Sequence, residues 1–170
     1  MTDSIIFKIS IILPTYNRAH ILSECIEQVI NQSYPSWELI ILDDHSSDKT
    51  FEIAQRYSKK DPRIILIRNE QRIFQDRNKK KGIAKSTYPY IFIIEDDLIL
   101  EKNCLQNLVF SYIELKKKYN VGAVAPRLTS LEPRENIPDN EPFVFNKLTG
   151  EIWNNYDLEG KEPIETFTLH

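Results

Sequence analysis

Residues 90–100 read Y-I-F-I-I-E-D-D-L-I-L, and the organisation of the whole chain follows from this stretch. Five aromatic or β-branched residues run directly into three acids, Glu95, Asp96 and Asp97. Such an apolar run is typical of a strand buried on both faces in a parallel sheet. Adjacent carboxylates at its end repel one another, so a cation or a hydrogen-bonding ligand would stabilise them. The alternative is that the acids only turn the chain towards solvent and cap the next helix.

The composition of the 170 residues is near globular averages, and a single domain is the simplest expectation. A net charge of −3 argues against a nucleic-acid-binding protein, which usually carries a basic excess. Cys25 and Cys104 have no partner at metal-ligand spacing and are expected to be buried thiols in a reducing cytoplasm. No apolar run approaches the ~18 residues that span a bilayer. We therefore expect a cytoplasmic location, with any attachment to the inner face of a membrane made by regions outside this segment.

Strands and helices are expected to alternate, which favours an α/β fold with a mostly parallel sheet. Apolar runs predict strands at 5–13, ended by Pro14, and at 37–42, 64–67, 90–94 and 121–125. Helical spacing predicts helices at 19–31, from 50 to a break at 61–62, at 77–85 and at 103–118. Asn17 and the serines at 46 and 47 are candidate helix caps. Beyond residue 126 we expect a long loop at 127–142 and a hairpin of 143–146 with 151–153.

Polar clusters follow three of the expected strands: Pro14-Thr15-Tyr16-Asn17-Arg18, Asp43-Asp44 and Glu95-Asp96-Asp97. In an open α/β sheet, ligands bind outside the carboxyl ends of the strands, so these clusters should meet at one crevice. Tyr16 could form an aromatic wall for a nucleobase, and Asp43 or Asp44 could accept hydrogen bonds from the base or sugar. The three acids of the opening stretch suit a divalent cation that also binds phosphates and water.

Four segments of the chain resemble, in order and spacing, the motifs of glycosyltransferase family 2, whose members have the GT-A fold. They are K-I-S-I-I-L-P-T-Y-N-R at 8–18, L-I-I-L-D-D-H-S-S-D-K-T at 39–50, Q-D-R-N at 75–78 and I-I-E-D-D-L-I-L at 93–100. The resemblance implies a three-layer α/β/α sandwich with a mostly parallel central sheet. It also implies a nucleotide-sugar-binding core at 1–126, with 127–170 beginning an acceptor-side region that continues beyond the segment.

The resemblance further implies an inverting transfer of sugar from a nucleotide-diphosphate donor, UDP preferred, to the hydroxyl of a saccharide, lipid-linked or other acceptor. The implied nucleotide-binding residues are Pro14, Thr15, Tyr16, Asn17, Arg18, Asp43, Asp44, Arg77 and Asp96. The implied metal is Mn²⁺ or Mg²⁺, held by Asp97 and Glu95. Four tail acids, Asp139, Glu141, Asp157 and Glu159, could supply the general base, but nothing in the sequence selects one.

The chain departs from the family pattern at three positions. Glu95 replaces a frequent aspartate, His45 replaces a common glycine, and the glycine expected shortly after Asn69 is absent. Three alternatives stay open. A non-catalytic nucleotide-sugar-binding module would keep the donor pocket alone. A sugar-nucleotide pyrophosphorylase should have a glycine-rich first loop, and a phospho-receiver domain should have acids after its first strand; this chain has neither. The lysines at 79–81 are expected to form a solvated helix face.

Overall fold

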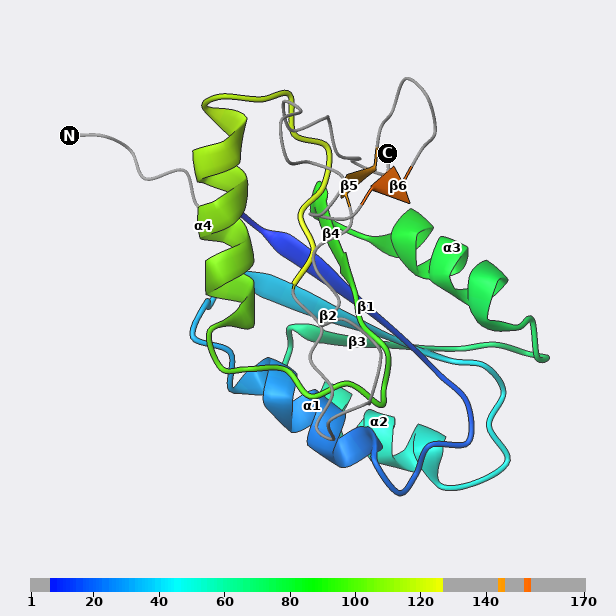
Figure 1. The fold of residues 1–170 in the computed structure, drawn as a ribbon. Coiled ribbons are helices and arrows are strands. Elements are labelled where there is room, and N and C mark those ends of the chain that lie inside the picture. Colours follow the sequence, from blue (N-terminus) through cyan, green and yellow to red (C-terminus); the bar gives the residue numbers. More distant parts are fainter. Residues whose placement is uncertain (1–6, 127–143, 146–151, 154–170) are drawn as a thin grey trace, which may run out of the picture. The chain divides into compact units, whose positions relative to one another are not determined.

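The computed structural model describes residues 7–126 and the strand residues 144–145 and 152–153. The chain divides into two compact units, residues 1–103 and 104–170. The first unit contains a four-stranded parallel sheet in the order β3-β2-β1-β4 (Figure 1). Its strands are β1 (Ile9–Thr15), β2 (Trp37–Asp43), β3 (Ile64–Arg68) and β4 (Tyr90–Ile93). The sheet confirms the expected α/β class with a parallel sheet.

Three helices connect these strands: α1 (Leu22–Ile30), α2 (Thr50–Lys60) and α3 (Gln75–Lys85). The chain moves in one direction from β1 to β3 and then returns across the sheet to β4. Because crossovers between parallel strands are right-handed, this reversal places α1 and α2 on one face and α3 on the other (Figure 1). The result is the three-layer α/β/α arrangement expected from the sequence.

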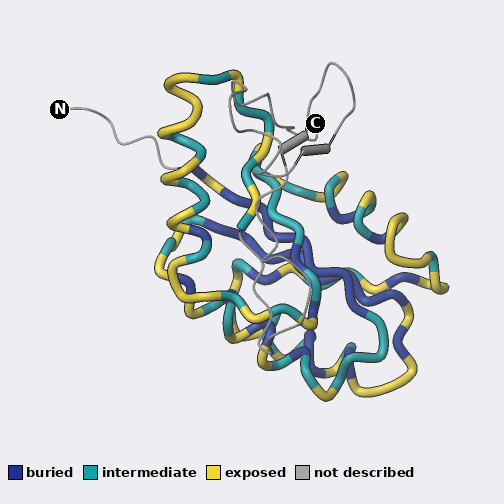
Figure 2. Tube along the Cα trace, viewed as in Figure 1, coloured by how far each residue is buried: buried dark blue, intermediate teal, exposed yellow. Residues whose placement is uncertain are grey.

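The two central strands are buried along their whole length, in keeping with their mostly apolar sequences, and the buried Ser10 donates a hydrogen bond to Glu38. Ile12, Ile40 and Leu42 form a core cluster on the face that α3 covers. Their neighbours in sequence point to the opposite face, where α1 buries Leu22 and Ile26. Figure 2 shows the buried residues concentrated in the strands. The sheet is therefore a rigid base whose carboxyl edge carries the polar loops.

The first strand continues past Pro14, which the sequence predicted to end it. β1 ends at Thr15, and Pro14 pairs in register with Leu42 of β2. Backbone groups of a parallel strand point alternately to its two neighbours, and the Ile12 carbonyl accepts a hydrogen bond from Ile94 N on the β4 side. Pro14 therefore also faces β4, whose pairing with β1 stops at Ile12. Pro14 has no N–H to donate, but no described strand pairs with β1 on that side at this position, so the sheet loses no hydrogen bond. The predicted break at Pro14 was therefore wrong.

The three expected cap residues, Asn17, Ser46 and Ser47, make other contacts instead. Asn17 does not cap α1; its Oδ1 accepts a hydrogen bond from Ser47 N at 2.9 Å. Ser46 Oγ accepts from Asn17 N at 3.0 Å instead of capping α2. At the start of α2, Asp48 Oδ1 accepts from Thr50 N at 2.9 Å. These side chains fasten the loop after β1 to the loop after β2.

The second unit contains helix α4 (Cys104–Lys116) and the antiparallel strands β5 (Val144–Phe145) and β6 (Ile152–Trp153). The two strands confirm the predicted pairing; the hairpin turn and the loop at 127–142 lie outside the described residues. The strand predicted at 121–125 is wrong, since residues 117–126 form neither helix nor strand. Its sequence, V-G-A-V-A, contains glycine and alanine, which pack poorly in a sheet.

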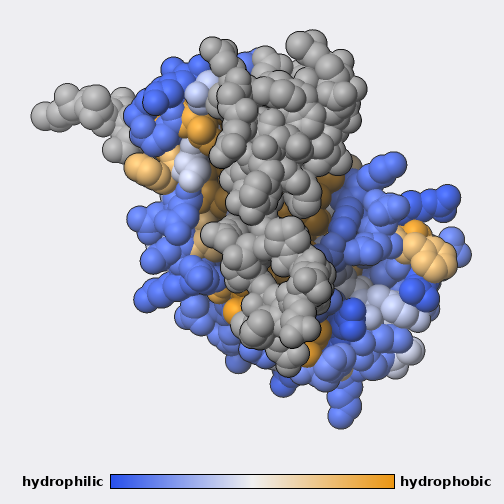
Figure 3. Space-filling model, viewed as in Figure 1, coloured by the Kyte–Doolittle hydropathy of each residue, from blue (hydrophilic) through white to orange (hydrophobic). Residues whose placement is uncertain are grey.

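Cys25 is buried, as predicted, and Cys104 is half-buried. Burial raises the pKa of the Cys25 thiol to about 12, with smaller contributions from Asp96 and Asp97. Cys25 is therefore a packing residue and not a nucleophile at neutral pH. The visible surface of the described residues is mostly hydrophilic (Figure 3). No helix in the described part of the chain is long and apolar enough to cross a bilayer.

Candidate functional site

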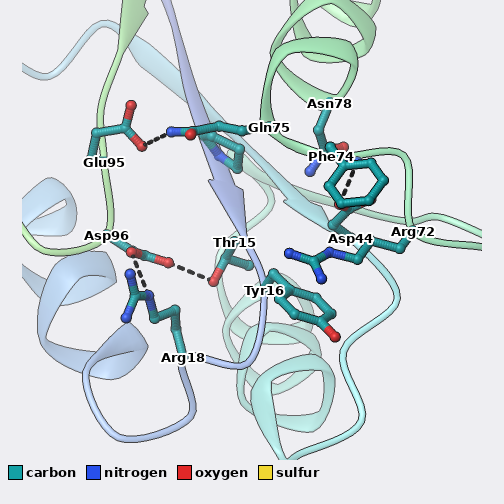
Figure 4. A pocket seen from close by; sticks show the side chains of 11 residues that line it. Thr15, Tyr16, Arg18, Asp44, Arg72, Phe74, Gln75, Asn78, Glu95 and Asp96 are labelled. Atoms are coloured by element: carbon teal, nitrogen blue, oxygen red, sulfur yellow. Dashed lines mark hydrogen bonds and ion pairs between the residues drawn. The ribbon is translucent and has the colours of Figure 1, made fainter.

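A pocket of about 220 Å³ lies at the carboxyl edge of the sheet (Figure 4). It is bordered by the ends of β1, β2 and β4 and by the start of α3. The residues that line it are Pro14, Thr15, Tyr16, Arg18, Asp44, Arg72, Phe74, Gln75, Asn78, Glu95 and Asp96. The strand order reverses between β1 and β4, and open α/β sheets bind ligands at such a reversal. The three polar clusters therefore meet as the sequence predicted.

Asp96 joins the ends of β1 and β4 in this pocket. Its Oδ2 accepts a hydrogen bond from Thr15 Oγ1 at 2.9 Å, and its Oδ1 accepts from Arg18 Nε at 3.1 Å (Figure 4). The Asp96 side chain is 8% exposed. Burial raises the pKa of Asp96 above its ordinary value; Thr15 and Arg18 lower it, and the neighbouring acids Asp97 and Glu95 raise it.

This raised pKa gives a testable pH dependence. The folded protein holds the Asp96 proton to a higher pH than the unfolded chain does. The stability that Asp96 contributes is therefore complete below its ordinary pKa and is lost as the pH rises through the folded value. The Asp96→Asn variant cannot ionise, so it should gain stability relative to the wild type as the pH rises from about 4, the ordinary pKa of an aspartate, through the raised pKa of Asp96. Urea unfolding of both proteins across this range measures the difference; a stability gap that does not change with pH would contradict the expectation.

Glu95 connects β4 to α3. Its Oε1 accepts a hydrogen bond from Lys79 Nζ at 2.5 Å, and its Oε2 accepts from Gln75 Nε2 at 2.7 Å. Lys79 therefore has a specific carboxylate partner, although the lysines at 79–81 were expected to form only a solvated face. Asp97 is exposed and forms no hydrogen bond or ion pair with the described residues. Of the two acids predicted to bind metal, Asp97 is thus the one with uncommitted oxygens.

The residues present suit a metal that is shared with a ligand. Among the described residues, no group of three or more His, Cys, Asp or Glu side chains could hold a metal ion alone. Mg²⁺ usually binds one or two protein carboxylates and takes its other ligands from phosphates and water. The adjacent acids raise the pKa of Asp96, so they lie close enough to repel one another. A divalent cation at Asp97 would relieve that repulsion, which fits the chemistry of the position.

Asp44 holds the segment that forms the opposite wall of the pocket. Its Oδ1 accepts hydrogen bonds from Asn69 Nδ2 and from the backbone N–H of Ile73, both at 2.8 Å. Its Oδ2 accepts from the backbone N–H of Phe74, also at 2.8 Å. The side chain is 3% exposed, so these charge-assisted bonds form away from competing water. Asp44 therefore both lines the pocket and fixes the chain that enters α3.

A buried amide network supports Asp44 from below. Asn69 Nδ2 also donates to Asn78 Oδ1 at 3.0 Å, and Asn78 Nδ2 donates to the Leu42 carbonyl at 2.9 Å. Lys81 Nζ completes the network with a 2.7 Å bond to Asn69 Oδ1. Because every member has a partner, the network can set one orientation for the Asp44 carboxylate.

Arg72 lies against two aromatic rings at the rim. Its Cζ is 3.9 Å from the centroid of the Tyr16 ring and 4.7 Å from that of the Phe74 ring. Figure 4 shows the guanidinium beside the Tyr16 ring, within the pocket. Arg72 and Phe74 are both exposed, so this cluster faces solvent as well as the cavity.

Three residues of these loops have a left-handed backbone. Asn17, His45 and Phe74 have φ angles of 53°, 63° and 66°. His45 stands where the family motif commonly has glycine, and its φ explains that preference. Its Nδ1 lies 3.2 Å from the Asn69 carbonyl oxygen, a hydrogen-bonding distance. Phe74 is the least usual of the three, because bulky residues rarely adopt a positive φ; its N–H donates to Asp44 and its carbonyl accepts from Asn78 N at 3.0 Å.

The pocket includes seven of the eleven residues that the sequence singled out: Pro14, Thr15, Tyr16, Arg18, Asp44, Glu95 and Asp96. Asn17, Asp43, Arg77 and Asp97 do not line it. Asp43 is fully buried at the end of β2, where its Oδ2 lies 3.3 Å from Arg68 Nε. Its Oδ1 accepts from Ser46 N at 3.2 Å. Arg77 is exposed on α3.

Sequence reasoning missed four lining residues: Arg72, Phe74, Gln75 and Asn78. Arg72 and Phe74 come from the connection between β3 and α3, which was interpreted only as a charged link. Gln75 and Asn78 lie in the first turn of α3, in the Q-D-R-N stretch that resembles a family motif, but only Arg77 of that stretch was predicted to bind the nucleotide. One signal was available. This connection also follows the carboxyl end of a parallel strand, so the rule that located the other three loops applies to it equally.

Comparison with known proteins decides the family. A family model described as glycosyl transferase family 2 matches residues 10–162. The chain belongs to this family. A family 2 relative from Campylobacter jejuni, a GalNAc(5)-diNAcBac-PP-undecaprenol beta-1,3-glucosyltransferase, is 32% identical over 174 residues. That match covers 94% of this chain and 56% of the relative. The chain spans between about a third and just over half of the length of three curated relatives that it matches.

Solved structures of GT-A glycosyltransferases share the fold. TarS from S. aureus in complex with UDP-GlcNAc matches with a TM-score of 0.59 and 18% identity, over 91% of this chain and 47% of TarS. A mannosyltransferase from Pyrobaculum calidifontis in complex with GDP-Man and Mn²⁺ matches with a TM-score of 0.61 and 20% identity. This second match covers 72% of the present chain and 36% of the mannosyltransferase.

Proposed function

We propose that the chain is the donor-binding part of an enzyme that transfers a sugar from a nucleotide-diphosphate donor to an acceptor hydroxyl. The observation that carries this proposal is the meeting of Thr15, Tyr16, Asp44 and Asp96 in one pocket where the strand order reverses. UDP is the preferred nucleotide, because TarS, which shares the fold, has been solved with UDP and with UDP-GlcNAc. The C. jejuni relative, named for an undecaprenol-linked acceptor, supports a lipid-linked saccharide as acceptor.

The base end of the donor would lie between Tyr16 and Asp44. A carboxylate offers about four acceptor positions, and Asp44 uses three of them on Asn69, Ile73 and Phe74. The remaining position can accept the ring N–H of uracil. The aromatic ring of Tyr16 supplies an apolar wall for the base. The network that holds Asp44 thus also orients the group that would recognise the base.

The ribose and diphosphate would lie towards β4. Asp96 is fixed by Thr15 and Arg18 and has further acceptor positions for a sugar hydroxyl. Asp97 would hold Mn²⁺ or Mg²⁺ with the phosphates. When bound, the metal would neutralise negative charge on the departing nucleoside diphosphate. Arg18 is 42% exposed, so its guanidinium could also reach a phosphate oxygen.

Transfer would invert the anomeric carbon, with the acceptor hydroxyl attacking from the face opposite the leaving nucleotide. That attack needs a general base, and the tail acids considered for this role lie outside the described residues. The family match argues against the phospho-receiver and pyrophosphorylase alternatives. An assay of UDP release, with and without undecaprenol-linked saccharides, distinguishes a transferase from a module that only binds the donor. A transferase releases UDP when the acceptor is present, whereas a binding module does not.

Metal-dependent donor binding is the first test. We expect Mn²⁺ to tighten UDP binding about tenfold, equivalent to ~1.4 kcal/mol, and Asp97→Asn to remove that increment. Isothermal titration with UDP, with uridine and with GDP, each with Mn²⁺ or EDTA, measures it. Uridine lacks phosphates, so its affinity should not respond to the metal.

Glu101→Gln is the matched control, because it removes one exposed negative charge four residues from Asp97. Its Mn²⁺ increment should equal that of the wild type. If Mn²⁺ increased the UDP affinity of Asp97→Asn as much as that of the wild type, the metal would bind elsewhere. Failure of the wild type to bind any nucleoside diphosphate would overturn the proposed function.

A further inference from the structure

The charged residues that line the pocket are not equally available to an anionic donor. Two cations line it, Arg18 and Arg72, together with three acids. Arg18 is paired with Asp96 at 3.1 Å, and the acid Glu95 is paired with Lys79. Arg72 forms no ion pair with any described residue. Of the two pocket cations, Arg72 is therefore the one whose charge is not already neutralised by a described residue.

The present position of Arg72 is against the proposed base-binding ring. Its guanidinium carbon lies 3.9 Å from the Tyr16 centroid, which is stacking distance, so it covers one face of that ring (Figure 4). A flat guanidinium and a flat nucleobase would compete for the same ring face. Base stacking there requires Arg72 to leave the ring.

The backbone around Arg72 is fixed while its side chain is exposed. The next two residues, Ile73 and Phe74, donate their backbone N–H groups to Asp44. The backbone that carries Arg72 is thus anchored at the pocket wall, and the long side chain can pivot from there. The family motif has a glycine in this connection, and this chain lacks it.

We propose that Arg72 binds the donor diphosphate, and that it releases the Tyr16 ring to do so, which uncovers the ring for the base. This inference rests on the proposed function. An exposed cation–π contact is weaker than paired, charge-assisted hydrogen bonds from a guanidinium to phosphate oxygens. A nucleoside diphosphate therefore breaks the contact between Arg72 and the Tyr16 ring, and its phosphates give Arg72 hydrogen bonds in exchange. A nucleoside without phosphates displaces Arg72 and offers it nothing in return.

The test compares ligands with and without phosphates. Isothermal titration of uridine, UMP and UDP is carried out on the wild type, Arg72→Gln and Arg56→Gln, all with Mn²⁺. Arg56→Gln is the matched control, because Arg56 is exposed on α2, away from the pocket lining. We expect Arg72→Gln to weaken UDP binding about tenfold or more, while uridine binds equally well or about threefold tighter. Arg56→Gln should change neither affinity.

Arg72→Gln should affect uridine and UDP binding unequally or in opposite directions. If Arg72 only maintained the structure of the pocket, its replacement would weaken the binding of both ligands equally. Equal losses for uridine and UDP in Arg72→Gln would overturn the inference but leave the proposed function standing. An unchanged UDP affinity would also overturn it. Absence of binding by the wild type to UDP, UMP and uridine would instead remove the proposed function itself. Urea unfolding of each variant checks that the fold is retained, as expected for an exposed side chain.

Discussion

The Asp44→Asn variant is expected to lose about 3 kcal/mol of unfolding free energy and to bind UDP at least about tenfold more weakly. The buried carboxylate accepts three hydrogen bonds, two of them from backbone N–H groups. An amide of the same shape has only one acceptor oxygen. If that oxygen stays with Asn69 and Ile73, the new NH₂ group points at the Phe74 N–H, and two donors face each other. Urea unfolding and UDP titration measure the two losses.

Asp76→Asn is the control for this prediction. Asp76 is exposed in the first turn of α3, so its replacement removes the same charge without breaking the network. It should lower the free energy of unfolding by about 0.3 to 1 kcal/mol, because it removes a favourable interaction with the helix dipole. If Asp44→Asn were as stable as Asp76→Asn, the hydrogen bonds from Ile73 and Phe74 would not be fixing the rim. Loss of stability without loss of UDP affinity would place the base elsewhere.

The position of the site could be predicted because it depends on features that are local in sequence. The apolar runs before Thr15 and Asp43 identify buried parallel strands, and the run before Glu95 identifies a third parallel strand, although β4 is half-buried at the end of the described sheet and not buried on both faces as predicted. Parallel strands end at one edge of the sheet. The strand order, with its reversal after β3, does not follow from the sequence pattern; once that order is given, right-handed crossovers place α3 on the face opposite α1 and α2. The ends of β1, β2 and β4 meet because parallel strands end at one edge of the sheet.

Which of two adjacent acids faces the pocket could not be predicted in the same way. Asp43 is the last residue of β2 and is paired with Thr15 in register, which turns its side chain towards Arg68. Asp44 is the next residue and points the other way, into the pocket. Side chains of an extended chain alternate, so an error of one residue in the strand end exchanges the two roles. The sequence could therefore name the pair but not choose between its members.

The rim formed by Arg72 and Phe74 was beyond sequence reasoning for a different reason. Phe74 has a φ of 66°, a conformation that bulky residues rarely adopt. It is held there by a hydrogen bond to Asp44, thirty residues away in the chain. A local pattern carries no information about such a long-range contact. The carboxyl-end rule could have pointed to this loop, but not to the stacking of Arg72 on Tyr16.

Gly82→Ala is expected to lower the unfolding free energy by about 2 kcal/mol, although alanine is the better helix former by about 1 kcal/mol. A methyl group on Gly82 would lie 2.6 Å from Ile12 Cγ2 and 2.7 Å from Leu42 Cδ1. Both neighbours are completely buried in the cluster between α3 and the sheet, so neither can move aside without disturbing other contacts. The helix must shift outwards, and with it Asn78, whose amide supports Asp44 through Asn69. UDP affinity should therefore fall together with stability.

Lys80→Ala on the exposed side of the same helix is the control, and it should leave both quantities unchanged within about 0.5 kcal/mol. Close packing is tested further by combining Gly82→Ala with Leu42→Ala, which removes one of the two clashing atoms. Because the second substitution makes room for the first, the double variant should lose less stability than the sum of the single losses. Strictly additive losses would mean that the methyl group is accommodated without touching Leu42. In that case the tight contact between α3 and β2 would not be what positions the amide network beneath the pocket.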